Sequence, residues 1–167
     1  YGKSKSQPNK ILDQWILARL EETVIKTTSN LEKYEVGEAA KEIEGLVDDL
    51  SRWYIRRSRK NVSGKTLKEV LNGIAKLIAP LSPFFAEGLY QSLGNKISVH
   101  LADWPITSKK LDKKLLEAMA EVRRLASLAL AERGKTGIKV RQPLSGLKIR
   151  SNKLKPTDKE LLGILAA

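Results

Sequence analysis

The chain has 167 residues, of which 31 are lysine or arginine and 19 are aspartate or glutamate, so its formal net charge is +12. With 41% hydrophobic residues it can bury the core of a globular domain, and its composition is not that of a disordered chain. A charge of this size attracts polyanions, so nucleic acid or an anionic membrane surface are the expected partners. No apolar run approaches the roughly 20 residues of a transmembrane helix, which excludes a membrane span.

The residue types that most metal and covalent chemistry needs are scarce. The chain has no cysteine and a single histidine, His100, so disulfides and clustered metal ligands are not expected. The sequence also lacks the phosphate-binding loop, the nucleophile elbow and the His-Glu-x-x-His pattern. Asp48 and Asp49 are paired carboxylates beside Arg52, where helical ion pairs are favoured over an acid–base role. We therefore predict no catalytic residue, no metal site and no cofactor in this chain.

The first half of the chain predicts two long helices after a polar linker at residues 1–9. Apolar residues recur at helical spacing from about Lys10, and again between about Val36 and Lys60. The first set is Ile11, Leu12, Trp15, Ile16, Leu20 and Val24, and the second is Ile43, Leu46, Val47, Leu50 and Tyr54. Turn residues at Asn61–Gly64 end the second helix, and Ser63 or Thr66 is expected to cap the next one.

The second half predicts a helix that prolines interrupt, followed by a last long helix. A helix is expected from about Thr66 until Pro80 and Pro83 break it, because proline removes an amide donor and clashes with the preceding turn. Helix then resumes over 83–93, residues 96–110 are irregular, and a long helix is expected over about 112–133. The alternation of Leu147 and Ile149 with Lys148 and Arg150 predicts a short strand.

The predicted fold class is mainly α. We expect an antiparallel helix bundle with a partial α+β appendage at the C-terminus, because the predicted strand has few visible partners downstream. The expected organisation is a linker over residues 1–9, a bundle over 10–106, and a long helix with the start of a junction subdomain over 107–167. The first residue is Tyr1, not methionine, so we expect the chain to be a piece of a longer protein.

The segment from Arg52 to Lys60 holds five basic residues in nine positions. On an α-helix, Arg52, Arg56 and Arg59 fall on one stripe with Lys60 beside it, because steps of three, four and seven residues return to the same side. Guanidinium groups bind phosphate oxygens through two parallel hydrogen bonds. Together with the net charge, this stripe favours contact with nucleic acid.

Trp53 and Arg57 are expected at the margin between the basic stripe and the buried face that contains Tyr54. An aromatic ring at such an edge can stack on an unpaired base, which suits RNA. The alternative is that Arg52 and Arg56 pair with the carboxylates before them and that Trp53 is packed. Two further basic residues, Lys139 and Arg141, lie in a loop after Gly137, where contact with phosphate and plain exposure to solvent are equally expected.

Five segments, in order, match motifs of one family. They are 12–20 (LDQWILARL), 47–59 (VDDLSRWYIRRSR), 78–87 (IAPLSPFFAE), 98–105 (SVHLADWP) and 137–144 (GIKVRQPL). Together they resemble the anticodon-binding domain of isoleucyl-tRNA synthetases, which are class I aminoacyl-tRNA synthetases. The third and fourth segments are shared with valyl and leucyl relatives, whereas the Trp-Tyr-x-Arg-Arg-Ser-Arg helix favours the isoleucyl enzymes.

The resemblance implies a fold and a function for the chain. The full enzyme would activate isoleucine with ATP and Mg²⁺ and esterify it to tRNA, whereas this chain would only hold the anticodon stem-loop, since the His-Ile-Gly-His signature is absent. The RNA-binding residues it implies are Trp53, Arg56, Arg57, Arg59 and Lys60, with Lys139 and Arg141 on the tRNA stem. Expected partners are isoleucine tRNAs and the catalytic domain of the same chain, in a cytoplasmic monomer with no membrane contact. Alternatives are a valyl or leucyl anticodon domain, a stand-alone RNA-binding module and a helical protein-interaction bundle.

Overall fold

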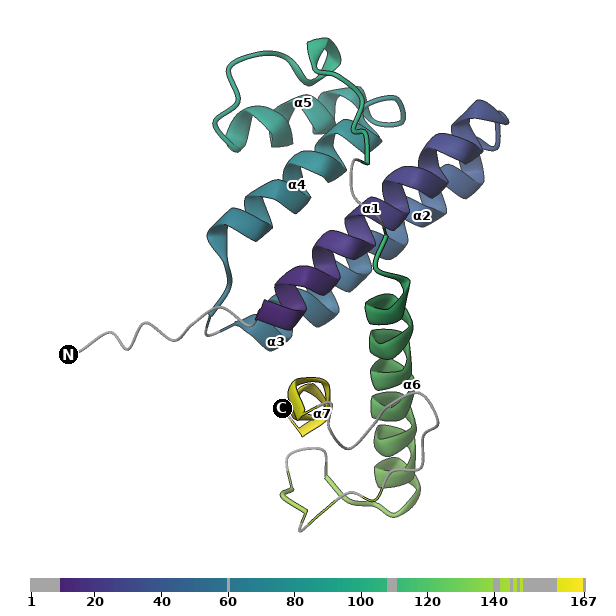
Figure 1. The fold of residues 1–167 in the computed structure, drawn as a ribbon, viewed down its shortest axis with the longest axis vertical. Coiled ribbons are helices and arrows are strands. Elements are labelled where there is room, and N and C mark those ends of the chain that lie inside the picture. Colours follow the sequence, from purple (N-terminus) through teal and green to yellow (C-terminus); the bar gives the residue numbers. More distant parts are fainter. Residues whose placement is uncertain are drawn as a thin grey trace, which may run out of the picture. The chain divides into compact units, whose positions relative to one another are not determined.

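The computed structural model describes residues 10–59, 61–107, 111–139, 142–144, 146, 148 and 159–166. The chain divides into two compact units, Tyr1–Leu111 and Asp112–Ala167. All the regular structure in the described ranges is helical, so the predicted mainly α class is confirmed (Figure 1). The helices are α1 (Lys10–Glu32), α2 (Val36–Asp48), the π-helical η1 (Asp49–Ile55), α3 (Arg56–Ser58), α4 (Gly64–Ile78), α5 (Pro83–Ser92), the 3₁₀-helical η2 (Val99–Leu101), α6 (Lys113–Lys135) and α7 (Lys159–Ala166).

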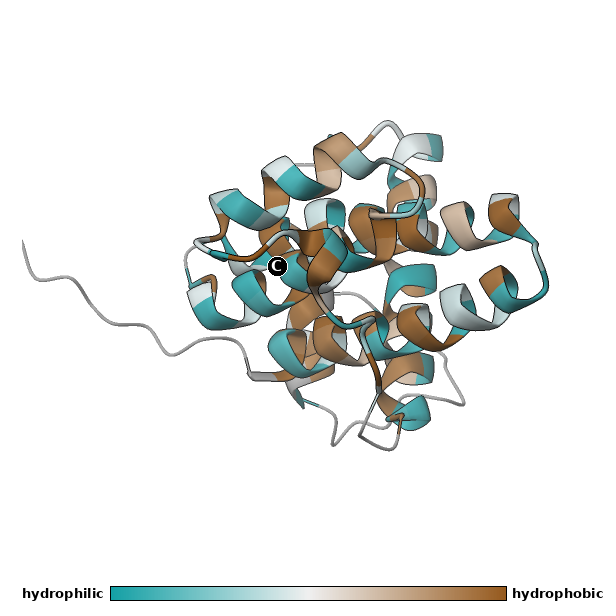
Figure 2. Ribbon diagram, turned by 90° about the horizontal axis from the view of Figure 1, so that it is seen from above, coloured by the Kyte–Doolittle hydropathy of each residue, from teal (hydrophilic) through white to brown (hydrophobic). Residues whose placement is uncertain are grey.

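The first unit is built on an antiparallel pair of helices. α1 lies alongside α2, and α4 packs against both of them before α5 folds back onto α4. Figure 2 shows hydrophobic and hydrophilic residues alternating along the helices, as expected of helices that bury part of their surface. The largest fully buried side chains of this unit include Leu12, Trp15, Ile16, Leu46, Tyr54, Val70 and Leu77.

α1 and α4 approach closely at one glycine. A Cβ added to Gly73 would lie 2.6 Å from Cδ1 of Leu20, closer than real carbon atoms come. The missing side chain at this position therefore lets the core leucine of α1 pack onto the backbone of α4.

The predicted helix boundaries between α3 and α5 are confirmed by their caps. Ser63 is the N-cap of α4, where its hydroxyl accepts a hydrogen bond of 3.2 Å from the amide of Thr66. α4 ends at Ile78, before the two prolines, and α5 begins with Pro83 in its first turn, where proline needs no amide donor.

Two side chains fasten the irregular segment after α5. The Glu87 carboxylate accepts hydrogen bonds from the Val99 amide at 2.8 Å and from the Ser98 hydroxyl at 3.0 Å. The Trp104 indole donates to the Thr28 hydroxyl of α1 at 2.9 Å. The segment is thus held at two points in a defined path over the first unit.

In the second unit, α6 and α7 pack against each other. The Asp112 side chain caps α6 by accepting a hydrogen bond of 3.0 Å from the Leu115 amide. α7 buries Leu161 and Ile164, which stand three residues apart and so share one helix face.

The α+β appendage predicted at the C-terminus is not supported. Leu147, Ile149 and Arg150 of the predicted strand lie outside the described residues, and the described ranges contain no strand. The described C-terminal residues form α7 instead, whose apolar residues follow a helical rather than an alternating spacing.

Candidate nucleic-acid interface

The basic segment begins on the π-helical turn that continues α2 and runs on into α3. From α2 through η1 to α3, one set of buried residues recurs at intervals of four, at Leu46, Leu50, Tyr54 and Ser58, and Asp49 of η1 is buried beside it. Residues four apart lie on one face of a regular α-helix, whereas residues five apart do not. A π-helix is wider because it bonds residue i to residue i+5, so residues five apart, such as Asp49 and Tyr54, come closer to one face. The π-turn therefore sets which side chains of the basic segment face outward.

Two tethers to α1 hold this turn. Asp49 is buried and accepts a hydrogen bond of 2.8 Å from Nε of Arg19, which also pairs with Glu22. Five residues later, the Tyr54 hydroxyl donates to Oδ1 of Asp13 at 2.5 Å. Five α-helical residues turn through roughly 500°, so positions 49 and 54 would point in different directions on a regular helix. The π-turn brings both toward α1.

The two tethers raise the pKa values of the groups that donate their hydrogen bonds, Arg19 and Tyr54. Burial opposes the charge of Arg19, but its hydrogen bonds and charge interactions with Asp49 and Glu22 raise its pKa overall. Burial, followed by the hydrogen bond to Asp13, raises the pKa of Tyr54 well above its usual range. Both groups therefore keep their protons at neutral pH, and Tyr54 remains a donor.

The predicted ion pair at Arg52 is present. Its Nε lies 2.7 Å from Oδ1 of Asp48, one helical turn earlier, and both side chains are exposed. An exposed pair of this kind contributes little free energy because water and salt screen it. Arg52 can therefore exchange this carboxylate for another anion at small cost.

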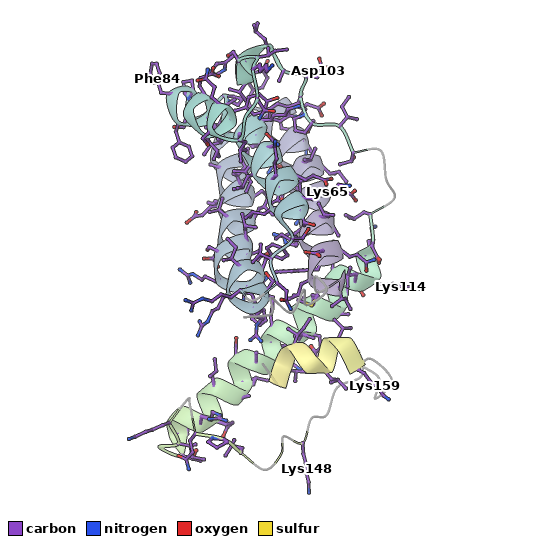
Figure 3. All side chains as sticks on the ribbon, turned by 90° about the vertical axis from the view of Figure 1, so that its left-hand side faces the viewer. Lys65, Phe84, Asp103, Lys114, Lys148 and Lys159 are labelled. Atoms are coloured by element: carbon purple, nitrogen blue, oxygen red, sulfur yellow. The ribbon has the colours of Figure 1, made fainter. Side chains whose placement is uncertain are left out.

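Arg56 and Arg59 are exposed, and within the described part of the chain neither has an ion-pair partner. The predicted pairing of Arg56 with the preceding carboxylates is thus not found there. Figure 3 shows nitrogen-tipped side chains projecting from the α3 end of the helix pair. Lys60, the other predicted residue of this stripe, lies outside the described residues.

Trp53 and Arg57 form a contact of their own. The guanidinium carbon of Arg57 lies 4.3 Å from the centroid of the Trp53 ring, and both side chains are half-buried, at the margin where the sequence predicts them. This separation is within the range of a cation–π interaction. Burial, with a further contribution from the charge of Arg56, lowers the pKa of Arg57.

The second predicted basic group lies in the second unit. Lys139 is exposed and follows Gly137, whose φ of +68° closes the end of α6, whereas Arg141 lies outside the described residues. Arg133, which the sequence does not single out, donates from Nη1 to the carbonyls of Lys139 at 2.9 Å and Gln142 at 3.0 Å. The sequence does not reveal this role of Arg133, because an arginine in the last turn of a helix commonly does no more than cap that helix.

The described residues hold no group of three or more side chains suited to bind a metal ion. No helix among them combines the length and the apolar content needed to cross a bilayer. What the first unit presents is a helical scaffold with exposed arginines beside a half-buried tryptophan. This combination is typical of helical modules that bind nucleic acid.

Comparison with known proteins defines the family. Residues 13–149 match the model of the anticodon-binding domain of tRNA ligases, so the chain belongs to this family. The resemblance read from the five sequence segments is thereby confirmed.

The similar proteins include several isoleucine–tRNA ligases. The chain is 43% identical to the enzyme of Deinococcus radiodurans over 152 residues, which cover 84% of the chain and 14% of the enzyme. It is 38% identical to the enzyme of Streptomyces avermitilis over 164 residues, 90% of the chain and 16% of the enzyme. It is 42% identical to isoleucine–tRNA ligase 2 of Bacillus cereus over 148 residues, 81% of the chain and 14% of the enzyme. The chain thus spans 14–16% of the length of these relatives, and they favour the isoleucyl alternative over the valyl and leucyl ones.

Proposed function

We propose that the chain is the anticodon-binding domain of an isoleucine–tRNA ligase and that it holds the anticodon stem-loop of isoleucine tRNAs. The family match and the isoleucine–tRNA ligases among its relatives support this proposal. The observation that carries it is the pair of exposed arginines, Arg56 and Arg59, beside Trp53 in a domain of this family.

The residues divide into groups with different roles. Arg56, Arg59 and Lys60 bind phosphate oxygens of the RNA backbone, which fixes the position of the stem-loop. Trp53 stacks on an unpaired base of the anticodon loop. Lys139 and Arg141 contact the tRNA stem. Backbone contacts supply affinity, and contacts to unpaired bases supply the choice among tRNAs.

The chemistry belongs to the longer protein. Its catalytic domain would use ATP and Mg²⁺ to activate isoleucine and would then transfer isoleucine to the tRNA. This domain only binds the anticodon stem-loop. We further propose that the longer protein is a monomer in the cytoplasm, where translation takes place.

The test is a titration of the chain with isoleucine tRNA and with the same tRNA carrying a swapped anticodon, each at two salt concentrations. We expect preference for the native anticodon and an affinity that falls steeply as salt rises. Equal binding of both tRNAs would mean that the domain binds the RNA backbone through charge alone and does not read the anticodon. Absence of binding at low salt would favour a protein-interaction bundle instead.

A matched pair of variants locates the interface. Arg56→Ala with Arg59→Ala should lower the slope of log affinity against log salt by roughly 1.4 to 1.8, because each phosphate contact accounts for roughly 0.7 to 0.9. Lys33→Ala with Lys96→Ala removes the same charge from exposed positions. Lys33 lies in the turn between α1 and α2, roughly 30 Å along α1 from the basic segment. The control should leave the slope nearly unchanged, and an equal effect of both pairs would contradict a localised site.

A further inference from the structure

Arg57, at the margin of the basic stripe, differs from Arg56 and Arg59, which lie on it. Its guanidinium lies against the Trp53 ring and is half-buried, whereas Arg56 and Arg59 are exposed. The side chains of Trp53 and Arg57 start four residues apart, where the π-helical turn gives way to α3. The backbone therefore presents the two side chains on the same side, and their contact follows from it.

We propose that Arg57 is a positioning residue: it fixes the plane of the Trp53 indole, on which an unpaired base of the anticodon loop stacks, and it does not itself bind phosphate. This inference rests on the proposed tRNA-binding function and deepens it, because it separates the basic residues into phosphate ligands and one residue that acts through tryptophan.

The geometry favours this assignment over a phosphate contact. A guanidinium within about 6 Å of a ring centroid is attracted to the π face, and the attraction grows as water is removed. Arg57 meets both conditions, since it lies 4.3 Å from the centroid and burial lowers its pKa. A phosphate contact would require this guanidinium to leave the ring. Arg56, which is exposed one residue earlier, reaches an anion without any such rearrangement.

Holding the indole has a direct consequence for base stacking. A tryptophan side chain has two rotatable torsions, and a base can stack on it only when both are fixed in one arrangement. With Arg57 against the ring, the entropy of ordering the indole is already lost in the free protein. Stacking then costs less when RNA arrives.

The first experiment measures isoleucine tRNA binding by the 167-residue chain as a function of salt. Arg57→Ala should weaken binding about threefold to tenfold at every salt concentration and leave the slope unchanged. Arg56→Ala should lower the slope by roughly 0.7 to 0.9. Arg57→Lys keeps a cation for the ring and should restore most of the affinity. A slope that falls in Arg57→Ala as it does in Arg56→Ala, or an unchanged affinity, would overturn the proposal.

The second experiment needs no RNA. The emission of Trp53 is obtained as the difference between the chain and its Trp53→Phe variant, which removes the background of Trp15 and Trp104. This emission should shift to the red in Arg57→Ala and stay nearly unchanged in Arg57→Lys and Arg56→Ala. No shift in Arg57→Ala would show that the arginine does not hold the ring. Circular dichroism and the thermal midpoint verify that each variant is folded.

A double-mutant cycle joins the two measurements. If Arg57 acts through Trp53, then Trp53→Leu with Arg57→Ala should weaken tRNA binding no more than Trp53→Leu alone. Additive losses would mean that the residues contribute separately and would contradict the proposal. Failure of the proposed function is recognised differently, because the unmodified chain would then not bind tRNA at all while the emission of Trp53 still responded to Arg57.

Discussion

The Tyr54 hydroxyl donates a hydrogen bond to the Asp13 carboxylate, which joins the π-helical turn to the first turn of α1 across 41 residues of sequence. Tyr54 is fully buried, and its ring belongs to the core while its hydroxyl reaches Asp13 of α1. One residue thus links the packing of the bundle to the position of the basic segment, because Trp53 and Arg56 lie on either side of it in the chain.

Tyr54→Phe should destabilise the chain by about 1 to 2 kcal/mol, because it removes one partner of a hydrogen bond to a charged group and leaves Asp13 without its donor. Chemical denaturation with urea measures the change. Tyr34→Phe is the matched control, since Tyr34 is 91% exposed and its hydroxyl can bond to water. If both substitutions had the same small effect, the hydrogen bond between Tyr54 and Asp13 would not contribute to the stability of the fold.

The same tether predicts a loss of stability in alkali. The pKa of Tyr54 is raised by burial and by Asp13, so the folded state keeps a proton that the unfolded state releases near pH 10. This contribution is complete below about pH 10 and declines as pH rises toward the higher pKa of the folded state. The difference in unfolding free energy between the chain and Tyr54→Phe should therefore shrink above about pH 10. A difference that grew with pH would be incompatible with the raised pKa.

Neighbouring carboxylates should differ sharply in their importance. Asp49 is buried against Arg19, whereas Asp48 is paired with Arg52 in solvent. Asp49→Ala should cost about 3 kcal/mol, at the lower end of the range for a broken buried pair, because Arg19 keeps Glu22. Asp48→Ala should cost less than about 1 kcal/mol. Thermal and urea unfolding of the two variants compare them directly, and similar costs would show that burial does not control the pair.

The helical architecture could be predicted from the sequence because apolar residues recur along the long helices every three or four residues, which is the spacing of an α-helix. Ser63 as a cap and Pro83 at the start of α5 could also be predicted from the sequence, since each has a local chemical reason. The π-helical turn was not. Residues 49–59 fit a regular α-helix in sequence, and only the tethers to Arg19 and Asp13, which come from a distant segment, favour the wider turn.

The candidate site shows the same division. The exposed positions of Arg56 and Arg59 follow from the helical pattern, whereas the contact between Arg57 and Trp53 and the role of Arg133 depend on side-chain conformation. The strand expected near residue 148 rests on a short alternation of apolar and basic residues, which is weak evidence without a partner strand, and most of its residues lie outside the described part of the chain.

Two glycines should respond in opposite ways to the same substitution. Gly73→Ala places a methyl group 2.6 Å from Leu20 in the core and should cost about 1 to 3 kcal/mol. Gly88→Ala, inside α5, meets nothing within 4 Å and should stabilise the chain by up to about 1 kcal/mol, because alanine has the higher helix propensity. Urea midpoints decide the matter, and a stabilising Gly73→Ala would show that α1 and α4 can separate without loss.

Acid should release the segment that follows α5. The Val99 amide, and after it the Ser98 and Gln91 side chains, lower the pKa of Glu87 by hydrogen bonding to its carboxylate. The unfolded state therefore takes up a proton near pH 4.3, before the folded state does, so this contribution to stability is present above that pH and is lost as pH falls through the lower pKa of the folded state.

Glu87→Gln removes the titration and weakens the bond to Val99. The protection factor of the Val99 amide, which corrects hydrogen exchange for its intrinsic pH dependence, should fall in Glu87→Gln at neutral pH, and in the unmodified chain only in acid. Glu69→Gln, an exposed carboxylate on α4, is the control and should leave the exchange unchanged. Slow exchange in Glu87→Gln would mean that the turn holds itself and that Glu87 merely lies beside it.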